Sequence, residues 1–136
     1  MNTITVVGTL GRDPELRFTA GGQAVVSFSV ADTRRWKNNQ GEQQEATTWI
    51  DVSAWQSLAE HCAASLTKGS RVTVTGRLES REYEAKDGTK RTAYQIVAEA
   101  VGPDLRFATV QVEKVQRDTP RANRAPDPVF GDEAPF

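Results

Sequence analysis

Apolar and polar residues alternate in five segments of the chain, and the same segments are rich in β-branched and aromatic side chains. This alternation is typical of β-strands that bury one face and expose the other. The predicted strands are Thr3–Leu10, Ala24–Thr33, Thr47–Trp55, Arg71–Glu84 and Lys90–Val101. An extra C-terminal strand over Asp104–Val115 is a further expectation, because Phe107, Val110 and Val112 are apolar, although the alternation there is imperfect.

One segment has the period of a helix. Within Gln56–Leu66, the apolar residues Leu58, Ala59 and Cys62 share one helical face, and a glycine follows the segment at a position suited to ending a helix. Between the fourth and fifth strands, Lys86–Thr89 contains Asp-Gly, the strongest short-range signal of a β-hairpin. These two strands are therefore expected to be antiparallel neighbours.

This order of elements predicts an all-β fold. Five strands with one short helix between the third and fourth are typical of a small closed barrel of the oligonucleotide-binding (OB) type, in which a sheet face and its loops hold nucleic acid. A plain β-sandwich is the structural alternative. The predicted domain covers residues 1–115 and the remainder, 116–136, is predicted to be a disordered tail, since it holds four of the six prolines and few bulky apolar residues.

The end of the sequence carries a second candidate site. Two acidic residues precede a terminal Ala-Pro-Phe, and an aromatic side chain left in water forgoes about 1.5 to 3 kcal/mol of burial. This pattern favours a tip that a partner protein binds; the alternative is a frayed terminus with a chance phenylalanine. The candidate partner-binding residues are Asp132, Glu133, Ala134, Pro135 and Phe136.

Charge and cysteine content narrow the function classes. The formal net charge is −1, and residues 1–115 hold 14 basic and 14 acidic residues, so any basic surface must be local. The sequence shows neither an apolar run long enough for a membrane span nor a secretory leader, and the expected location is cytoplasmic. A single cysteine, Cys62, excludes an intrachain disulfide and is expected to serve packing.

Strand parity places two tryptophans on an outward face. In the third strand Ile50, Val52 and Ala54 form the apolar face, so Trp49 and Trp55 point the other way. Exposed aromatics beside cations are typical of a platform on which bases stack while Arg and Lys meet the phosphates. The alternative for both tryptophans is packing under a loop, the helix or another subunit.

The fourth strand repeats this arrangement. Its apolar residues Val72, Val74 and Leu78 take even positions, while Tyr83 lies on the odd face with three arginines. A further aromatic, Trp36, lies just past the second strand beside three more cations, which are equally consistent with a merely solvated cluster. The candidate phosphate contacts are Arg34, Arg35, Lys37, Arg71, Arg77 and Arg81.

These residues resemble one known family, the bacterial single-stranded DNA-binding proteins, over residues 1–112 and the terminal tip. The resemblance is carried by Val6–Arg17 (VVGTLGRDPELR), Trp49, Trp55, Leu58–Glu60, Lys68–Ser70 and Gly76–Leu78. It implies that Trp36, Trp49, Trp55 and Tyr83 stack with bases. It also implies an OB barrel assembled as a homotetramer, wrapped by single-stranded DNA and associated with the nucleoid, whose acidic Pro-Phe tips recruit replication and repair enzymes.

The sequence departs from the family pattern at the tip, where only two acids adjoin Pro-Phe and the linker is short. Asp104–Val112 is similar to an added strand of actinobacterial members that clasps neighbouring subunits. These residues are as typical of a paralogue specialised for recombination or DNA uptake as of a housekeeping member of the family.

The sequence as a whole predicts a non-enzymatic, sequence-tolerant single-strand binder that needs no cofactor or metal. One alternative is a protein-interaction adaptor whose outward tryptophans bind another protein. The other is a nucleic-acid hydrolase, which would require a metal cluster or a nucleophile–base pair, and no such spacing occurs in the sequence.

Overall fold

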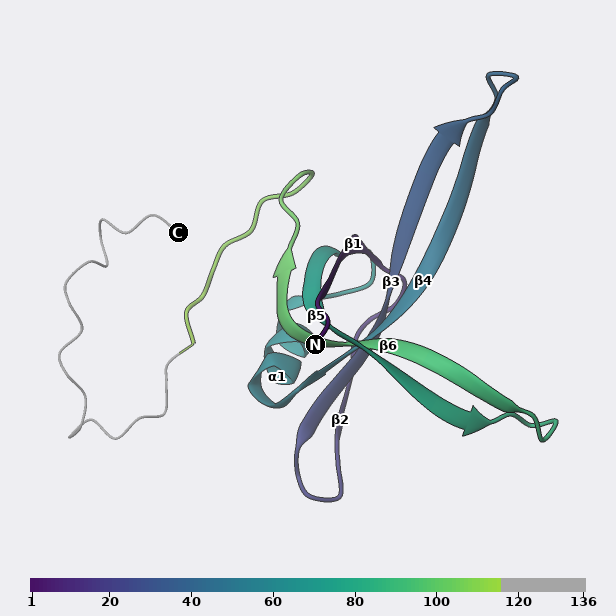
Figure 1. Ribbon diagram of the computed structural model, residues 1–136. Helices are drawn as coiled ribbons and strands as arrows, with labels where there is room; N and C mark the ends of the chain where they lie inside the picture. Colours follow the sequence, from purple (N-terminus) through teal and green to yellow (C-terminus); the bar gives the residue numbers. More distant parts are fainter. Residues whose placement is uncertain (116–136) are drawn as a thin grey trace.

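The computed structural model describes residues 1–115 and contains six strands and one helix (Figure 1). They are β1 (Ile4–Leu10), β2 (Glu15–Phe18), β3 (Ala24–Lys37), β4 (Gln43–Trp55), α1 (Gln56–Ser65), β5 (Arg71–Glu84) and β6 (Lys90–Pro103). The five predicted strands and the helix are confirmed, and Leu66 caps the helix instead of belonging to it. No helix in residues 1–115 is both long and apolar enough to cross a membrane.

The strands close into a barrel. Their order is β1-β5-β6-β4-β3, and a further pairing of β1 with β3 joins the two ends. All pairs are antiparallel except β4 with β6, in which Val52 lies beside Ile96. This is the predicted OB barrel, and β2 is an additional strand that pairs only with β3.

The barrel interior is filled by the side chains that alternation assigned to it. Phe28, Val52, Val72 and Val74 are fully buried, together with residues of β1 and β6. The helix α1 packs against this core through Ala59 and Cys62. Burial raises the pKa of the Cys62 thiol to about 11, so the group stays neutral and serves packing as expected.

Two hairpin arms extend beyond the barrel, one formed by β3 and β4 and the other by β5 and β6 (Figure 1). The first is longer than predicted because its outer part is held by polar cross-strand pairs instead of apolar ones. Thr33 and Thr47 are hydrogen-bonded at 3.1 Å, and Arg35 donates to Glu45 at 3.0 Å. The second ends in the predicted Asp-Gly turn, with Gly88 at φ +84°.

One strand was not predicted, and one prediction of a strand was wrong. Glu15–Phe18 forms β2, although its four exposed residues carry too short a pattern to be recognised. Asp104–Val115 forms no strand: apart from the hydrogen bond of the Asp104 N–H to the Arg71 carbonyl, it has no ladder with any strand of residues 1–115. Its apolar side chains therefore remain exposed, with Phe107 at 74%.

Candidate nucleic-acid interface

Strand pairing joins the outward faces of β4 and β5 into one surface. Ser53 of β4 lies beside Val97 of β6, and Ala93 of β6 lies opposite Arg81 of β5. Since residues paired across a sheet share a face, the odd-numbered residues of these strands project to the same side. The surface carries Trp49, Trp55 and Tyr83, which are 60%, 43% and 43% exposed. We call it the platform.

Local backbone geometry places each tryptophan. Gly11 lies against the six-membered ring of Trp49, so that a methyl group on Gly11 would come within 2.5 Å of Cζ3 and 2.8 Å of Cη2. One part of the indole is thus supported by the backbone. At Trp55 the chain turns directly from β4 into α1, and the left-handed backbone of Gln56 (φ +59°) leaves the indole at that corner.

Trp36 lies apart from the platform. The β3–β4 pairing continues through Trp36 opposite Gln44, which puts this tryptophan on the even-numbered side of the ribbon, while Trp49 is on the odd-numbered side. The ring is 41% exposed, and the guanidinium carbon of Arg34 lies 4.8 Å from its centroid. The arm therefore offers a second, separate aromatic contact.

The six candidate cations fall into two groups. Arg35, Arg71 and Arg77 pair with Glu45, Asp104 and Glu79 at 3.0, 2.6 and 2.6 Å respectively. Within residues 1–115, Arg34, Lys37 and Arg81 have no acidic partner. The second group therefore carries charge that is not already compensated.

Arg71 lies away from the platform, at the first position of β5, next to the segment that follows β6. Its guanidinium donates to Asp104, and this hydrogen bond lowers the pKa of that carboxyl below its usual value. The guanidinium carbon is also 5.6 Å from the centroid of Phe107. The sequence prediction, which rests on alternation along the strand, had placed Arg71 on the same face as Arg81.

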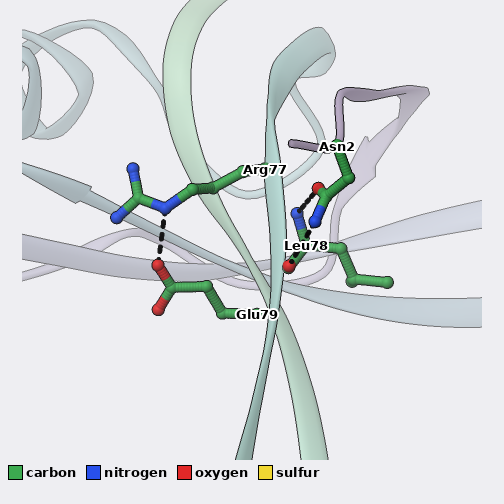
Figure 2. A network of polar contacts seen from close by, with 4 residues as sticks. All are labelled: Asn2, Arg77, Leu78 and Glu79. Atoms are coloured by element: carbon green, nitrogen blue, oxygen red, sulfur yellow. Dashed lines mark hydrogen bonds and ion pairs between the residues drawn. The ribbon is translucent and has the colours of Figure 1, made fainter.

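The point at which β5 leaves the barrel is held by the start of the chain (Figure 2). The Asn2 side-chain amide donates to the Leu78 carbonyl at 3.2 Å, and its oxygen accepts from the Leu78 N–H at 2.7 Å. Beside this contact, Arg77 donates to Glu79. Leu78 lies on the core-facing side, as parity predicted, but it is partly exposed because the strand has left the closed part of the barrel.

A groove in the platform contains side chains that the sequence reasoning missed. It is lined by Arg17, Ser27, Ser53, Trp55, Arg81 and Gln95, among others. The alternation of faces along β4 already placed Ser53 outward. Once β6 is paired with β5, the same alternation also places Gln95 outward. Arg17 was out of reach because β2 was not predicted.

In the part of the chain that the structure describes, no three His, Cys, Asp or Glu side chains are placed to hold a metal ion. The predicted tip, Asp132, Glu133, Ala134, Pro135 and Phe136, lies outside the described residues, as does the remainder of the predicted tail.

Comparison with known proteins agrees with the resemblance found in the sequence. The family model described as "Single-strand binding protein family" matches residues 1–104. The single-stranded DNA-binding proteins of Paenarthrobacter aurescens and Mycolicibacterium smegmatis are 47% and 48% identical to the chain, each over 85% of its length and over 69% and 71% of their own. A solved structure described as a Plasmodium falciparum SSB complex with ssDNA matches with a TM-score of 0.69 and 25% identity, over 76% of this chain and 94% of that one.

Proposed function

Because the chain belongs to the single-strand binding protein family, we propose that it binds single-stranded DNA without sequence specificity and protects it. The observation that carries this proposal is the platform, on which Trp49, Trp55 and Tyr83 lie exposed on one continuous face. Every base has a flat π surface, so stacking on such rings tolerates any sequence. The function is binding, without catalysis, cofactor or metal.

Stacking is the main source of affinity in this proposal. Each base–aromatic contact contributes about 1 to 3 kcal/mol, and four such contacts, with Trp36 included, total about 4 to 12 kcal/mol before ordering costs. The net charge of −1 provides no general attraction for DNA. Affinity should therefore fall only moderately as salt is added.

The phosphates are held by local cations. Arg34, Lys37 and Arg81 are the better candidates, because the structure gives them no acidic partner within residues 1–115. Arg35 and Arg77 can contribute only by sharing or leaving their carboxylates. Arg71 contributes least, since it lies beside Asp104 and Phe107.

Tryptophan fluorescence tests the proposal directly. Adding a dT oligomer should quench the emission, because bases stack on the exposed indoles. An adaptor that uses the same face for a protein would stay bright, and this result would overturn the proposal. Incubation of labelled DNA with magnesium or manganese tests the remaining alternative, since a hydrolase would shorten the strand.

The proposed assembly is a homotetramer wrapped by the strand. The support is family membership, together with the exposed apolar residues of the segment after β6, Leu105, Phe107, Val110, Val112 and Val115, which have room for a neighbour. Light scattering with and without dT oligomers should give the mass of four chains in both cases. A monomer at micromolar concentration would contradict this part of the proposal.

The biological role that we propose is in replication, recombination and repair at the nucleoid, with residues 1–115 as the binding and oligomerisation domain. Residues 116–136 are proposed as a tail whose tip, Asp132–Phe136, recruits partner enzymes. Removing Ala134–Phe136 should abolish partner pull-down while DNA binding persists or tightens. Retained partners would exclude the tip from this role.

A further inference from the structure

A groove of about 380 Å³ is hollowed in the platform beside Trp55. Ligand pockets in proteins measure about 300 to 1,000 Å³, so this groove is sized for one small planar group. Its lining includes Arg17, Ser27, Ser53, Trp55, Arg81 and Gln95. They come from five strands, β2, β3, β4, β5 and β6, and therefore meet only in the folded barrel.

The floor of the groove contains an unexplained polar group. Ser53 is only 6% exposed, and its hydroxyl has no hydrogen-bond partner within residues 1–115. A buried hydroxyl without a partner destabilises a protein, and such groups in native structures usually serve a further purpose. A serine hydroxyl both donates and accepts, and it reorients by rotation about one side-chain bond. The Ser53 oxygen is almost fully covered in the free chain, so its side chain must rotate toward the groove to serve a polar atom that enters there.

The rim of the groove is positively charged and aromatic. Arg17 and Arg81 are exposed and have no ion-pair partner in the described part of the chain, and no acidic side chain lines the groove. The Trp55 indole forms one wall, and the Gln95 side chain offers both a donor and an acceptor. An aromatic wall, two free guanidinium groups and an unsatisfied hydroxyl together match the three parts of a nucleotide contact: ring, phosphate and base edge.

We propose that this groove is a subsite for one nucleotide of the bound strand. The base stacks on Trp55, its hydrogen-bonding edge meets Ser53 and Gln95, and Arg17 and Arg81 hold the adjacent phosphates. The inference rests on the proposed binding of single-stranded DNA and adds to it a polar readout of the base at one position, on a surface that otherwise recognises bases only by stacking.

A comparison of two short oligomers isolates this polar readout. One is made of thymidine, the other of the difluorotoluene nucleoside, which keeps the shape of thymine but scarcely forms hydrogen bonds. The ratio of their affinities is measured for the full chain and for Ser53→Ala. One net hydrogen bond corresponds to a factor of about two to ten, so the preference for thymidine should shrink by that factor in the variant. Ser29→Ala is the matched control, since that hydroxyl donates to Asp51 and does not line the groove.

Each outcome decides between the two proposals. An unchanged ratio in Ser53→Ala, with both oligomers still bound, overturns the subsite and leaves the proposed function standing. A wild-type chain that binds neither oligomer overturns both. The melting temperature of Ser53→Ala should equal or exceed that of the wild type, because the substitution removes a buried unpaired hydroxyl. Equal shifts of the ratio in Ser53→Ala and Ser29→Ala would also overturn the subsite, since the effect would then not belong to the groove.

Discussion

Each end of β5 carries an arginine beside an exposed aromatic residue, but only one of the two arginines is paired with an acid. Arg71 and Arg81 have the same parity on one strand, and each accompanies an exposed aromatic, Phe107 for the first and Trp55 for the second. Ten residues of strand separate them by roughly 30 Å. At the Arg71 end, Nε of Arg71 forms an ion pair with Oδ2 of Asp104 at 2.6 Å. Arg81 has no acidic partner in residues 1–115.

This difference shows that an aromatic beside an arginine is an incomplete signal for nucleic-acid binding. We call the Arg71 end closed, because its guanidinium is already paired with Asp104 and packs against Phe107. The Arg81 end is open, because its charge faces a groove without acids. What distinguishes a candidate binding surface is a cation that has no acidic partner among residues 1–115.

The largest expected effect separates the aromatics of the two ends. Replacing Trp49 and Trp55 together by Ala should lower the affinity for a dT oligomer by about 30-fold or more, since two stacking contacts are lost. The fold should survive, because neither tryptophan belongs to the hydrophobic core. Phe107→Leu is the matched control: it removes the aromatic ring but keeps an apolar side chain for the proposed neighbouring subunit, so affinity should stay nearly unchanged. Titration by fluorescence anisotropy checks this, and equal losses in both variants would abolish the distinction between the ends.

The next prediction concerns the two arginines. Arg81→Gln should weaken binding about fivefold at low salt and make the slope of log affinity against log salt shallower by about 0.7, the value for one phosphate contact on a single strand. Arg71→Gln should leave that slope unchanged. Affinities measured across a series of salt concentrations test both variants, and a shallower slope for Arg71→Gln would move the binding surface to the other end of β5.

A smaller effect is expected from the support of Trp49. Gly11→Ala introduces a methyl group where the indole ring lies, so the ring must shift. Affinity should fall about three- to tenfold through impaired stacking, with weaker fluorescence quenching at saturation. Gly102→Ala is the control, because a methyl group there meets no atom within 4 Å. If both variants bind like the wild type, the contact with Gly11 does not orient Trp49 for stacking.

Much of the fold and part of the site could be predicted from the sequence. Alternation identified five strands and put Trp49 and Trp55 outward, because one face of each strand must be buried in the barrel. The outer part of the β3–β4 arm lacks an apolar face, and β2 has only four residues, all exposed, so the alternation of apolar and polar residues did not reveal them. Conversely, the apolar residues of Asp104–Val115 imitate a strand that finds no pairing partner in the described chain.

Which arginines form ion pairs could be predicted from the sequence only in part. Arg71 and Asp104 are 33 positions apart, and they meet only because β6 returns along β5 and ends beside its first residue. The partner of Arg77, two positions along the same strand, was readable in principle, since alternate residues share a face. This long-range pairing depends on the length and register of the β5–β6 pairing, including its irregularity between Thr75 and Gly76, which local patterns do not encode.

The smallest expected effect tests whether the Arg71 end is closed. The bond from Arg71 holds the pKa of Asp104 below its usual value of 3.8, so this pair stabilises the fold fully above that pH and progressively less as the pH falls through the lowered pKa. Asp104→Asn should therefore lower the melting temperature at pH 7 by no more than about 3 °C, because the pair is only part-buried, with side chains 35% and 23% exposed, and the gap to the wild type should narrow as the pH falls below 3.8. Asp87 also has a lowered pKa through Thr89, but it titrates in both proteins and cancels in the difference.

Thermal melts from pH 2 to 7 measure this gap in melting temperature. The salt slope of DNA binding should not change in Asp104→Asn, even though Arg71 has lost its acidic partner. A steeper slope would mean that Asp104 alone keeps Arg71 from the strand, and the two ends of β5 would then differ by one carboxylate instead of by their place in the barrel.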